Sequence, residues 1–95
     1  PGRPLVSQGV EIQTVRPRFA SSTRVMANPG NFVVRMHFGH EGKLQSHQVL
    51  QSTGVPDVDR STLDALYQWR AVGPVIDALK EPATMTIDVR ILYRD

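Results

Sequence analysis

The chain has 95 residues and a formal net charge of +2; 40% of its residues are hydrophobic and 21% are charged. This length and composition predict one globular domain with a modest core rather than a disordered segment. Because the chain contains no cysteine, disulfide frameworks, thiolate zinc sites and cysteine nucleophiles are excluded. Its basic residues are scattered, whereas nucleic-acid-binding domains usually carry a clustered basic stripe.

The start of the chain is expected to lie outside the folded core. Residues 1–9 contain two prolines and two glycines, which predicts a tail or linker remnant followed by a single domain at residues 10–95. This segment lacks the apolar stretch of a signal peptide, and no apolar run approaches the roughly 20 residues needed to cross a bilayer. We therefore expect any membrane anchor to lie outside this sequence.

The amino-terminal third contains one weak strand signal. Val10–Val15 alternates between apolar and polar residues and is predicted to form a short strand, which could occupy an edge of a larger sheet. Residues 19–25 are rich in serine and threonine, which fits a cap or turn as well as a short helical turn. Ala27–Asn31 contains a Pro-Gly pair and is predicted to be a loop.

The segment from residue 32 to residue 50 has the pattern of a β-hairpin. In Phe32–Phe38 every second residue is apolar, so four side chains share the face expected to point into the core: Phe32, Val34, Met36 and Phe38. Glu41-Gly42 suits the turn, because glycine most readily adopts a positive φ.

The return strand of this hairpin is less regular. Leu44 and Val49 have opposite parity, so an uninterrupted strand cannot bury both. A β-bulge near Gln45-Ser46 would resolve the conflict by pairing Phe38 near Leu44 and Val34 near Val49.

The second half of the chain predicts a helix and a final strand. Asp57 or Asp59 is a candidate helix cap, and apolar residues recur at helical spacing up to Trp69, which we expect in the core. Gly73-Pro74 ends that helix, and one more helical turn fits residues 75–79. Residues 85–93 alternate regularly and indicate a strand. The fold class is therefore α+β, with a small antiparallel sheet of three main strands and a possible amino-terminal strand, packed on one amphipathic helix.

The chain offers no convincing catalytic or metal site. His37, His40 and His47 are not expected to converge, because the first points away from the core, the second lies in the turn and the third faces the core side. The serines lack a plausible base with an orienting acid. We therefore expect no catalytic residue, no bound metal and no cofactor, and we do not expect an enzyme.

The order of these segments resembles the carboxy-terminal domain shared by TonB-type and TolA-type energy transducers. The resemblance covers residues 31–94 and comprises, in order, an alternating strand, the turn Glu41-Gly42-Lys43, a strand that ends in Ser52-Thr53-Gly54-Val55-Pro56, a helix that closes on Trp69-Arg70, and an alternating last strand. Residues 75–79 look like an insertion relative to the family pattern.

The resemblance implies a periplasmic protein-interaction domain of an inner-membrane-anchored protein. In such families an extended segment of an outer-membrane transporter adds as a strand beside the last strand of the domain. The edge strand supplies unpaired main-chain groups, and its side chains supply selection. The residues that the resemblance places at this edge are Thr84, Thr86, Asp88, Arg90, Leu92 and Arg94. Arg70 is a possible partner contact, although its more ordinary role is to cap the helix.

Two other functions compete with this interpretation. The first is an assembly or structural module of the cell envelope that uses the same fold to form a homodimer or to contact another envelope component. The second is a small RNA-binding domain, which would need exposed aromatic residues and clustered basic residues on a sheet face. The outward residues Val33, Arg35 and His37 provide neither, so we do not expect a nucleic-acid partner.

Overall fold

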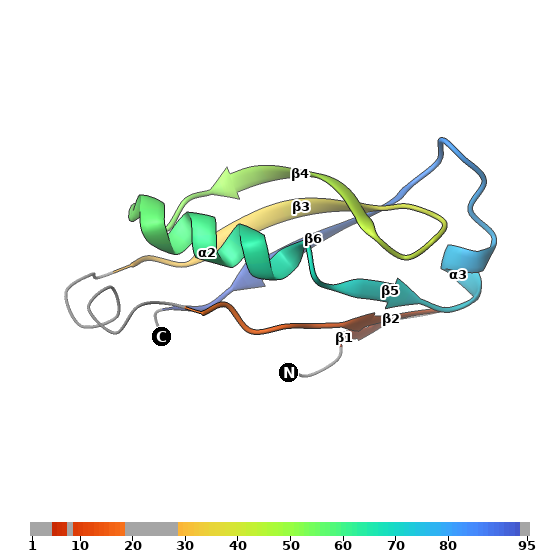
Figure 1. Cartoon of the computed structure of the whole chain (residues 1–95), viewed down its shortest axis with the longest axis horizontal. Coiled ribbons are helices and arrows are strands. Elements are labelled where there is room, and N and C mark those ends of the chain that lie inside the picture. The colour runs from red at the N-terminus through yellow and green to blue at the C-terminus, as the bar shows by residue number, and fades with distance from the viewer. Residues whose placement is uncertain (1–4, 8, 19–28, 94–95) are drawn as a thin grey trace.

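The structure is a computed structural model that describes residues 5–7, 9–18 and 29–93. Its strands form two antiparallel three-stranded sheets. The smaller sheet has the order β1 (Leu5–Ser7), β2 (Val10–Gln13), β5 (Arg70–Val72), and the main sheet has the order β4 (Leu44–Gln51), β3 (Phe32–Phe38), β6 (Met85–Ile91). Figure 1 shows α2 (Pro56–Leu66) lying across the main sheet and the short α3 (Pro74–Asp77) beyond the end of β5.

The main sheet is built around β3, which pairs with β4 on one side and β6 on the other. The four side chains predicted to face the core are all fully buried: Phe32, Val34, Met36 and Phe38. Helix α2 contributes a buried stripe at helical spacing, which consists of Val58, Thr62, Ala65 and Leu66. This arrangement confirms the predicted α+β fold. Within the described residues, no helix has the length and apolar character that crossing a membrane requires.

The predicted β-bulge is present in β4. Phe38 pairs with Leu44 and Val34 pairs with Val49, and the register shifts by one residue at Gln45. A second shift at Leu50 was not predicted. The bulge aligns the two apolar residues but does not bury both: Leu44 is buried, whereas Val49 is 39% exposed because β4 lies at the edge of the sheet.

The smaller sheet corrects two sequence-based expectations. Residues 5–7 lie in the segment predicted to be a tail, yet they form β1, which pairs with β2. Gly9, just before β2, has φ 74°. The other side of β2 pairs with β5, a strand that was not predicted. Among the described strands, β2 has no pairing with the main sheet, so it leaves the edges of that sheet open. Main-chain groups of β2 thus find partners on both sides, which local sequence patterns do not reveal.

The hairpin turn of the main sheet joins the two sheets. The Ala71 N–H in β5 donates a 2.8 Å hydrogen bond to the Gly42 carbonyl, and Lys43 forms an isolated bridge with Arg70. Gly42 has φ 79°, and a Cβ atom at this position would collide with the Ala71 carbonyl oxygen. Glycine is therefore required here both for its backbone conformation and for the close approach of β5.

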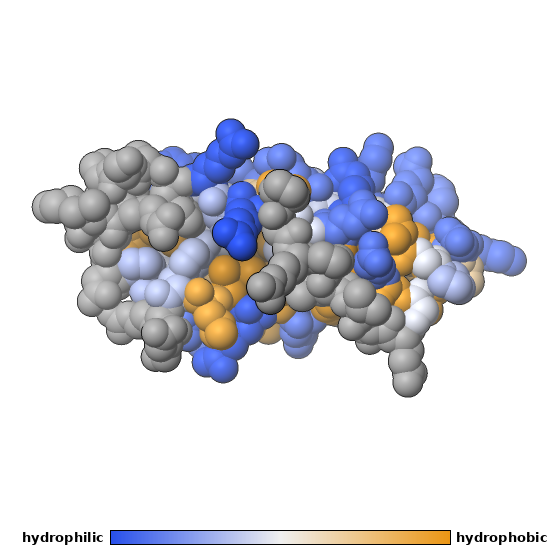
Figure 2. All heavy atoms as spheres, turned by 90° about the horizontal axis from the view of Figure 1, so that it is seen from below, coloured by the Kyte–Doolittle hydropathy of each residue, from blue (hydrophilic) through white to orange (hydrophobic). Residues whose placement is uncertain are grey.

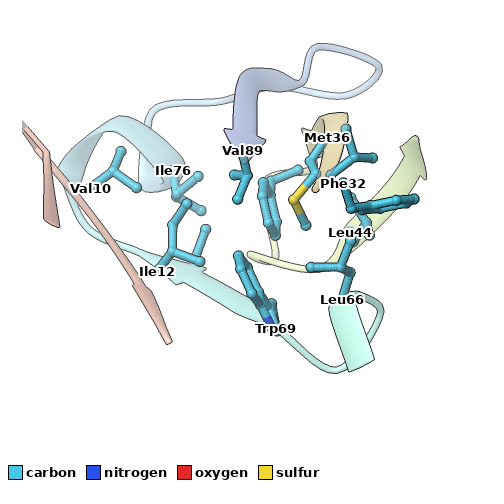
Figure 3. Close-up of a cluster of buried hydrophobic side chains, with 12 residues drawn as sticks. Val10, Ile12, Phe32, Met36, Leu44, Leu66, Trp69, Ile76 and Val89 are labelled. Atoms are coloured by element: carbon cyan, nitrogen blue, oxygen red, sulfur yellow. The ribbon is translucent and has the colours of Figure 1, made fainter. Parts of the chain in front are cut away.

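Trp69 lies in the core, as predicted, but beyond the end of α2, which finishes at Leu66. Its side chain is 4% exposed and points into the centre of the apolar cluster, between Ile12 on one side and Leu66 on the other (Figure 3). The indole Nε1–H donates a 2.9 Å hydrogen bond to the carbonyl oxygen of Val15. This residue therefore connects the helix and main sheet with the chain that follows β2.

Helix α2 is preceded by a loop that Asp59 holds in place. The helix cap is Val55, which makes no side-chain hydrogen bond, so neither predicted aspartate is the capping residue itself. Asp59 instead accepts hydrogen bonds from the Thr53 N–H and from the hydroxyls of Ser52 and Thr53. Burial opposes its ionisation, but these hydrogen bonds together lower the pKa of its carboxyl below the ordinary value. The predicted turn or helix at residues 19–25 lies outside the described residues.

Replacing Trp69 tests its place in the core. We expect Trp69→Ala to lower the free energy of unfolding by about 3–5 kcal/mol, because it removes a large buried side chain and its hydrogen bond. Trp69→Phe keeps most of the apolar volume and should cost clearly less. Urea denaturation followed by circular dichroism measures both variants. A Trp69→Ala protein with wild-type stability would contradict the core assignment.

Two glycines provide a matched test of the joint between the sheets. Gly42 and Gly54 both have a positive φ, but a Cβ at Gly54 would meet no atom within 4 Å. Alanine at either position should therefore cost about 1–2 kcal/mol for the left-handed conformation. We expect Gly42→Ala to cost more than Gly54→Ala, because it also displaces β5. Equal losses in thermal denaturation would show that the contact with Ala71 contributes little.

Candidate functional site

Strand β6 forms one edge of the main sheet. It pairs with β3 through seven consecutive residue pairs, from Phe38↔Met85 to Phe32↔Ile91, without a register shift. No other described strand pairs with its opposite side. An edge strand presents a row of main-chain N–H and C=O groups that another extended chain can pair with. The structure therefore offers a regular seven-residue edge at the position expected from the sequence.

The outward face of β6 is polar, and two of its side chains are hydrogen-bonded to side chains of β3. Thr86, Asp88 and Arg90 are exposed, as the alternation predicted. The Arg35 guanidinium donates hydrogen bonds of 2.8 and 3.1 Å to the two carboxylate oxygens of Asp88. The His37 Nδ1 and the Thr86 hydroxyl are hydrogen-bonded at 2.8 Å. These two pairs occupy the polar groups of Thr86 and Asp88.

The two charged residues on the outward face of β6, Asp88 and Arg90, differ in whether a described residue of opposite charge pairs with them. The hydrogen bond from Arg35 lowers the pKa of the Asp88 carboxyl and raises the pKa of the Arg35 guanidinium. Arg90 lies opposite the apolar Val33 and forms no ion pair with the described residues. The outward face of β6 therefore carries one compensated acidic group and one uncompensated basic group.

The inward face of β6 is apolar and incompletely covered. Val89 is buried, whereas Met85, Ile87 and Ile91 are half-buried against the core cluster. Their exposure follows from their position in an edge strand, because no described strand lies beyond β6. Figure 2, a view from below, shows apolar residues reaching the surface in separate patches among hydrophilic ones.

The remaining residues expected at this edge flank the strand. Thr84 is half-buried and precedes β6, and Leu92 follows it and is 67% exposed. Arg94 lies outside the described residues. Tyr93, which follows Leu92, makes two hydrogen bonds. Its N–H donates to the Asn31 side-chain oxygen, and its hydroxyl is hydrogen-bonded to Thr62 in α2. These contacts anchor the chain just after β6, although the sequence pattern does not reveal them.

Arg70 lies in the smaller sheet rather than at the β6 edge. Its guanidinium Nη1 donates hydrogen bonds to the carbonyl oxygens of Tyr67 and Trp69, just after α2. This matches the expected role at the carboxyl end of the helix. Arg70 and the residues of β6 therefore lie on strands of two different sheets.

A second surface feature was not predicted from the sequence. A cleft of about 360 Å³ lies between the chain that follows β2 and helix α2, and its lining includes Arg16, Arg18 and Asp64. The two arginines are distant in sequence from Asp64 and come near it only through packing of the two segments. Neither arginine forms an ion pair with the described part of the chain.

The three histidines lie in different environments. The His47 Nδ1 is hydrogen-bonded to the Tyr67 hydroxyl at 2.7 Å, and His40 lies 3.4 Å from a carboxylate oxygen of Glu81. His37 contacts Thr86, as described above. Across residues 5–7, 9–18 and 29–93, no three histidine, aspartate or glutamate side chains come close enough together to hold a metal ion.

Comparisons with known proteins agree with this geometry. Residues 15–94 match the family model described as Gram-negative bacterial TonB protein C-terminal. Among solved structures, the chain is similar to the solution NMR structure of the Pseudomonas aeruginosa TonB carboxy-terminal domain, with a TM-score of 0.65. That likeness covers 88% of this chain and 86% of the other at 18% sequence identity, so it concerns the fold alone. The comparison with curated proteins finds no match.

The Arg35–Asp88 ion pair should make the stability of the fold depend on pH. Because the pKa of Asp88 is lowered in the folded chain, the pair stabilises the fold above the ordinary value of 3.8, and this stabilisation is lost as pH falls through the folded pKa. We expect Arg35→Gln to raise the pKa of Asp88 back toward that value. Carboxyl-carbon NMR titration of both proteins measures the shift. An unchanged Asp88 pKa in the variant would contradict the pairing.

Proposed function

This chain belongs to the family of carboxy-terminal domains of Gram-negative bacterial TonB proteins, and on that basis we propose that it binds an extended segment of an outer-membrane transporter by strand addition at β6. The domains of this family interact with proteins in the periplasm, and we place this chain in the same compartment. The observation that carries the proposed binding mode is the regular, open edge of β6.

The other strand edges of the described residues are less suited to this role. Strand β4 is the opposite edge of the main sheet, but two register shifts interrupt its ladder, and bulges of this kind disrupt pairing at an edge. Strands β1 and β5 are the edges of the smaller sheet, and each has three residues. Strand β6 combines seven residues with an uninterrupted register, which favours it as the template for a partner strand.

The alternating side chains of β6 favour a partner strand that has one apolar face and one polar face. A strand that pairs with β6 would continue the pleat of the sheet, so alternate side chains would lie beside the inward and outward residues. Apolar partner residues would cover the half-buried Met85, Ile87 and Ile91. Main-chain hydrogen bonds would supply much of the affinity, and these side-chain contacts would supply the selection.

The proposed activity is protein binding without catalysis. Among the described residues, His37 and His47 are hydrogen-bonded to Thr86 and Tyr67, His40 lies near Glu81, and none of the three is paired with a serine nucleophile. We propose that the domain transmits an interaction from an inner-membrane-anchored protein to its transporter partner. The experiment below also distinguishes the competing proposal, in which the same edge pairs with a second copy of the chain.

An NMR titration tests strand addition. Peptides from the amino-terminal segments of outer-membrane transporters are added to the ¹⁵N-labelled domain, and we expect the largest amide shifts in residues 84–92. A proline placed at either of two adjacent central positions of the peptide serves as the control. Successive N–H groups of a strand point in opposite directions, so one of the two prolines should remove a hydrogen bond to β6 and weaken binding.

Two results would overturn the proposal. Shifts centred on β4 or on the Arg16–Arg18 cleft would move the binding site elsewhere. No shift at millimolar peptide, with all β6 amides protected from hydrogen exchange, would mean that the edge is already filled. Sedimentation equilibrium would then show whether a second copy of the chain fills it, which is the outcome that the assembly-module alternative requires.

A further inference from the structure

We propose that Arg90 makes the β6 edge selective for a partner strand with an acidic side chain at the position beside it. This inference rests on the proposed strand addition at β6 and specifies which partner sequences bind best. It concerns the outward face of the strand, where the uncompensated charge lies, rather than the apolar inward face.

The cross-strand row that contains Arg90 provides no acidic partner. Arg90 pairs with Val33 of the central strand, and Val33 pairs with Gln51 of β4 on its other side. Gln51 donates its side-chain N–H to the Asn31 carbonyl. The row therefore consists of an amide, an apolar side chain and an exposed guanidinium, with the guanidinium beside the open edge.

The neighbouring acidic residue on this face is already engaged. Asp88 lies two residues before Arg90 on the same face, and both of its carboxylate oxygens accept hydrogen bonds from Arg35. Thr86 is likewise engaged by His37. Of the three outward residues of β6, only Arg90 has a charged group that pairs with no described residue and is therefore available to a new strand. Thr86 and Asp88 are hydrogen-bonded to side chains of β3. Arg90 is therefore the outward residue whose charge would favour one partner sequence over another.

A strand added beside β6 would place one side chain directly next to Arg90. Directly opposed residues in an antiparallel pair have Cβ atoms about 4.5–5.5 Å apart, and opposite charges at such positions are favourable whereas like charges are unfavourable. The guanidinium can bind a carboxylate through two parallel hydrogen bonds, whereas a lysine in the partner would repel it. An acidic residue at this one position should therefore increase affinity.

Peptides with a single variable position test this selectivity. The host peptide alternates valine and threonine over seven residues, carries blocked ends, and has short Gly-Ser tails for solubility. Glutamate, glutamine or lysine replaces each threonine in turn, so that the position beside Arg90 is found in either strand direction. At one position we expect glutamate to bind about threefold more tightly than glutamine, and lysine more weakly than glutamine.

Variants of the domain assign the preference to Arg90. Arg90→Glu should reverse the order of glutamate and lysine at that same peptide position, whereas Arg90→Lys should keep the order. Arg60→Gln serves as the charge control, because it also removes one positive charge but lies in α2, where Arg60 pairs with Asp57. Its glutamate preference should equal that of the wild-type domain. Arg90 is exposed, and amide spectra of each variant verify that its fold is retained.

The outcomes separate this inference from the proposed function. If the host peptide shifts the β6 amides but glutamate, glutamine and lysine bind equally at every position, strand addition stands and the role of Arg90 is wrong. That role is also wrong if the glutamate preference persists in Arg90→Glu. If the host peptide and the transporter peptides bind away from β6, strand addition itself fails.

Discussion

Burial of one face of β3 is the constraint on which the structure depends. Its four inward side chains are completely removed from solvent, and each contributes about 1.5–3 kcal/mol to the hydrophobic stabilisation of the domain. A strand so buried needs partners for its main chain on both sides, and β4 and β6 supply them. Because no further described strand pairs with β4 or β6 in this sheet, both are edges. The open edge at β6 therefore follows from the way the core is built.

The two edges then differ because of their side chains. Strand β4 must align Leu44 and Val49 with the same face of β3, and it does so through a bulge that interrupts the ladder. Strand β6 alternates without conflict and keeps seven consecutive pairs. The strand with the most regular pattern is consequently also the better template for another chain. Outward polar residues on β6 limit unspecific association, since charged groups at an edge disfavour pairing with arbitrary apolar strands.

The smaller sheet stabilises the domain without forming main-chain pairs with β6 among the described strands. Its strand β5 is held against the turn of the main hairpin by Gly42, and Trp69 ties the chain after β2 to the centre of the core. These contacts join the two sheets while β6 keeps its open side among the described strands. In a family whose members bind other proteins, such a division lets the core and the proposed binding edge be altered separately.

Much of this structure follows from the sequence alone. Alternation in β3 and β6, the glycine turn, the bulge at Gln45 and the buried stripe of α2 were all predicted, because period and parity act within a few residues. Strands β1 and β5, the hydrogen bond from Trp69 to Val15 and the cleft beside Arg16 were not predicted. The engagement of Asp88 by Arg35, which leaves Arg90 uncompensated, also required the structure. Which residues are inward or outward is a local property of the chain, whereas which groups meet across 50 or more residues depends on how the whole chain packs.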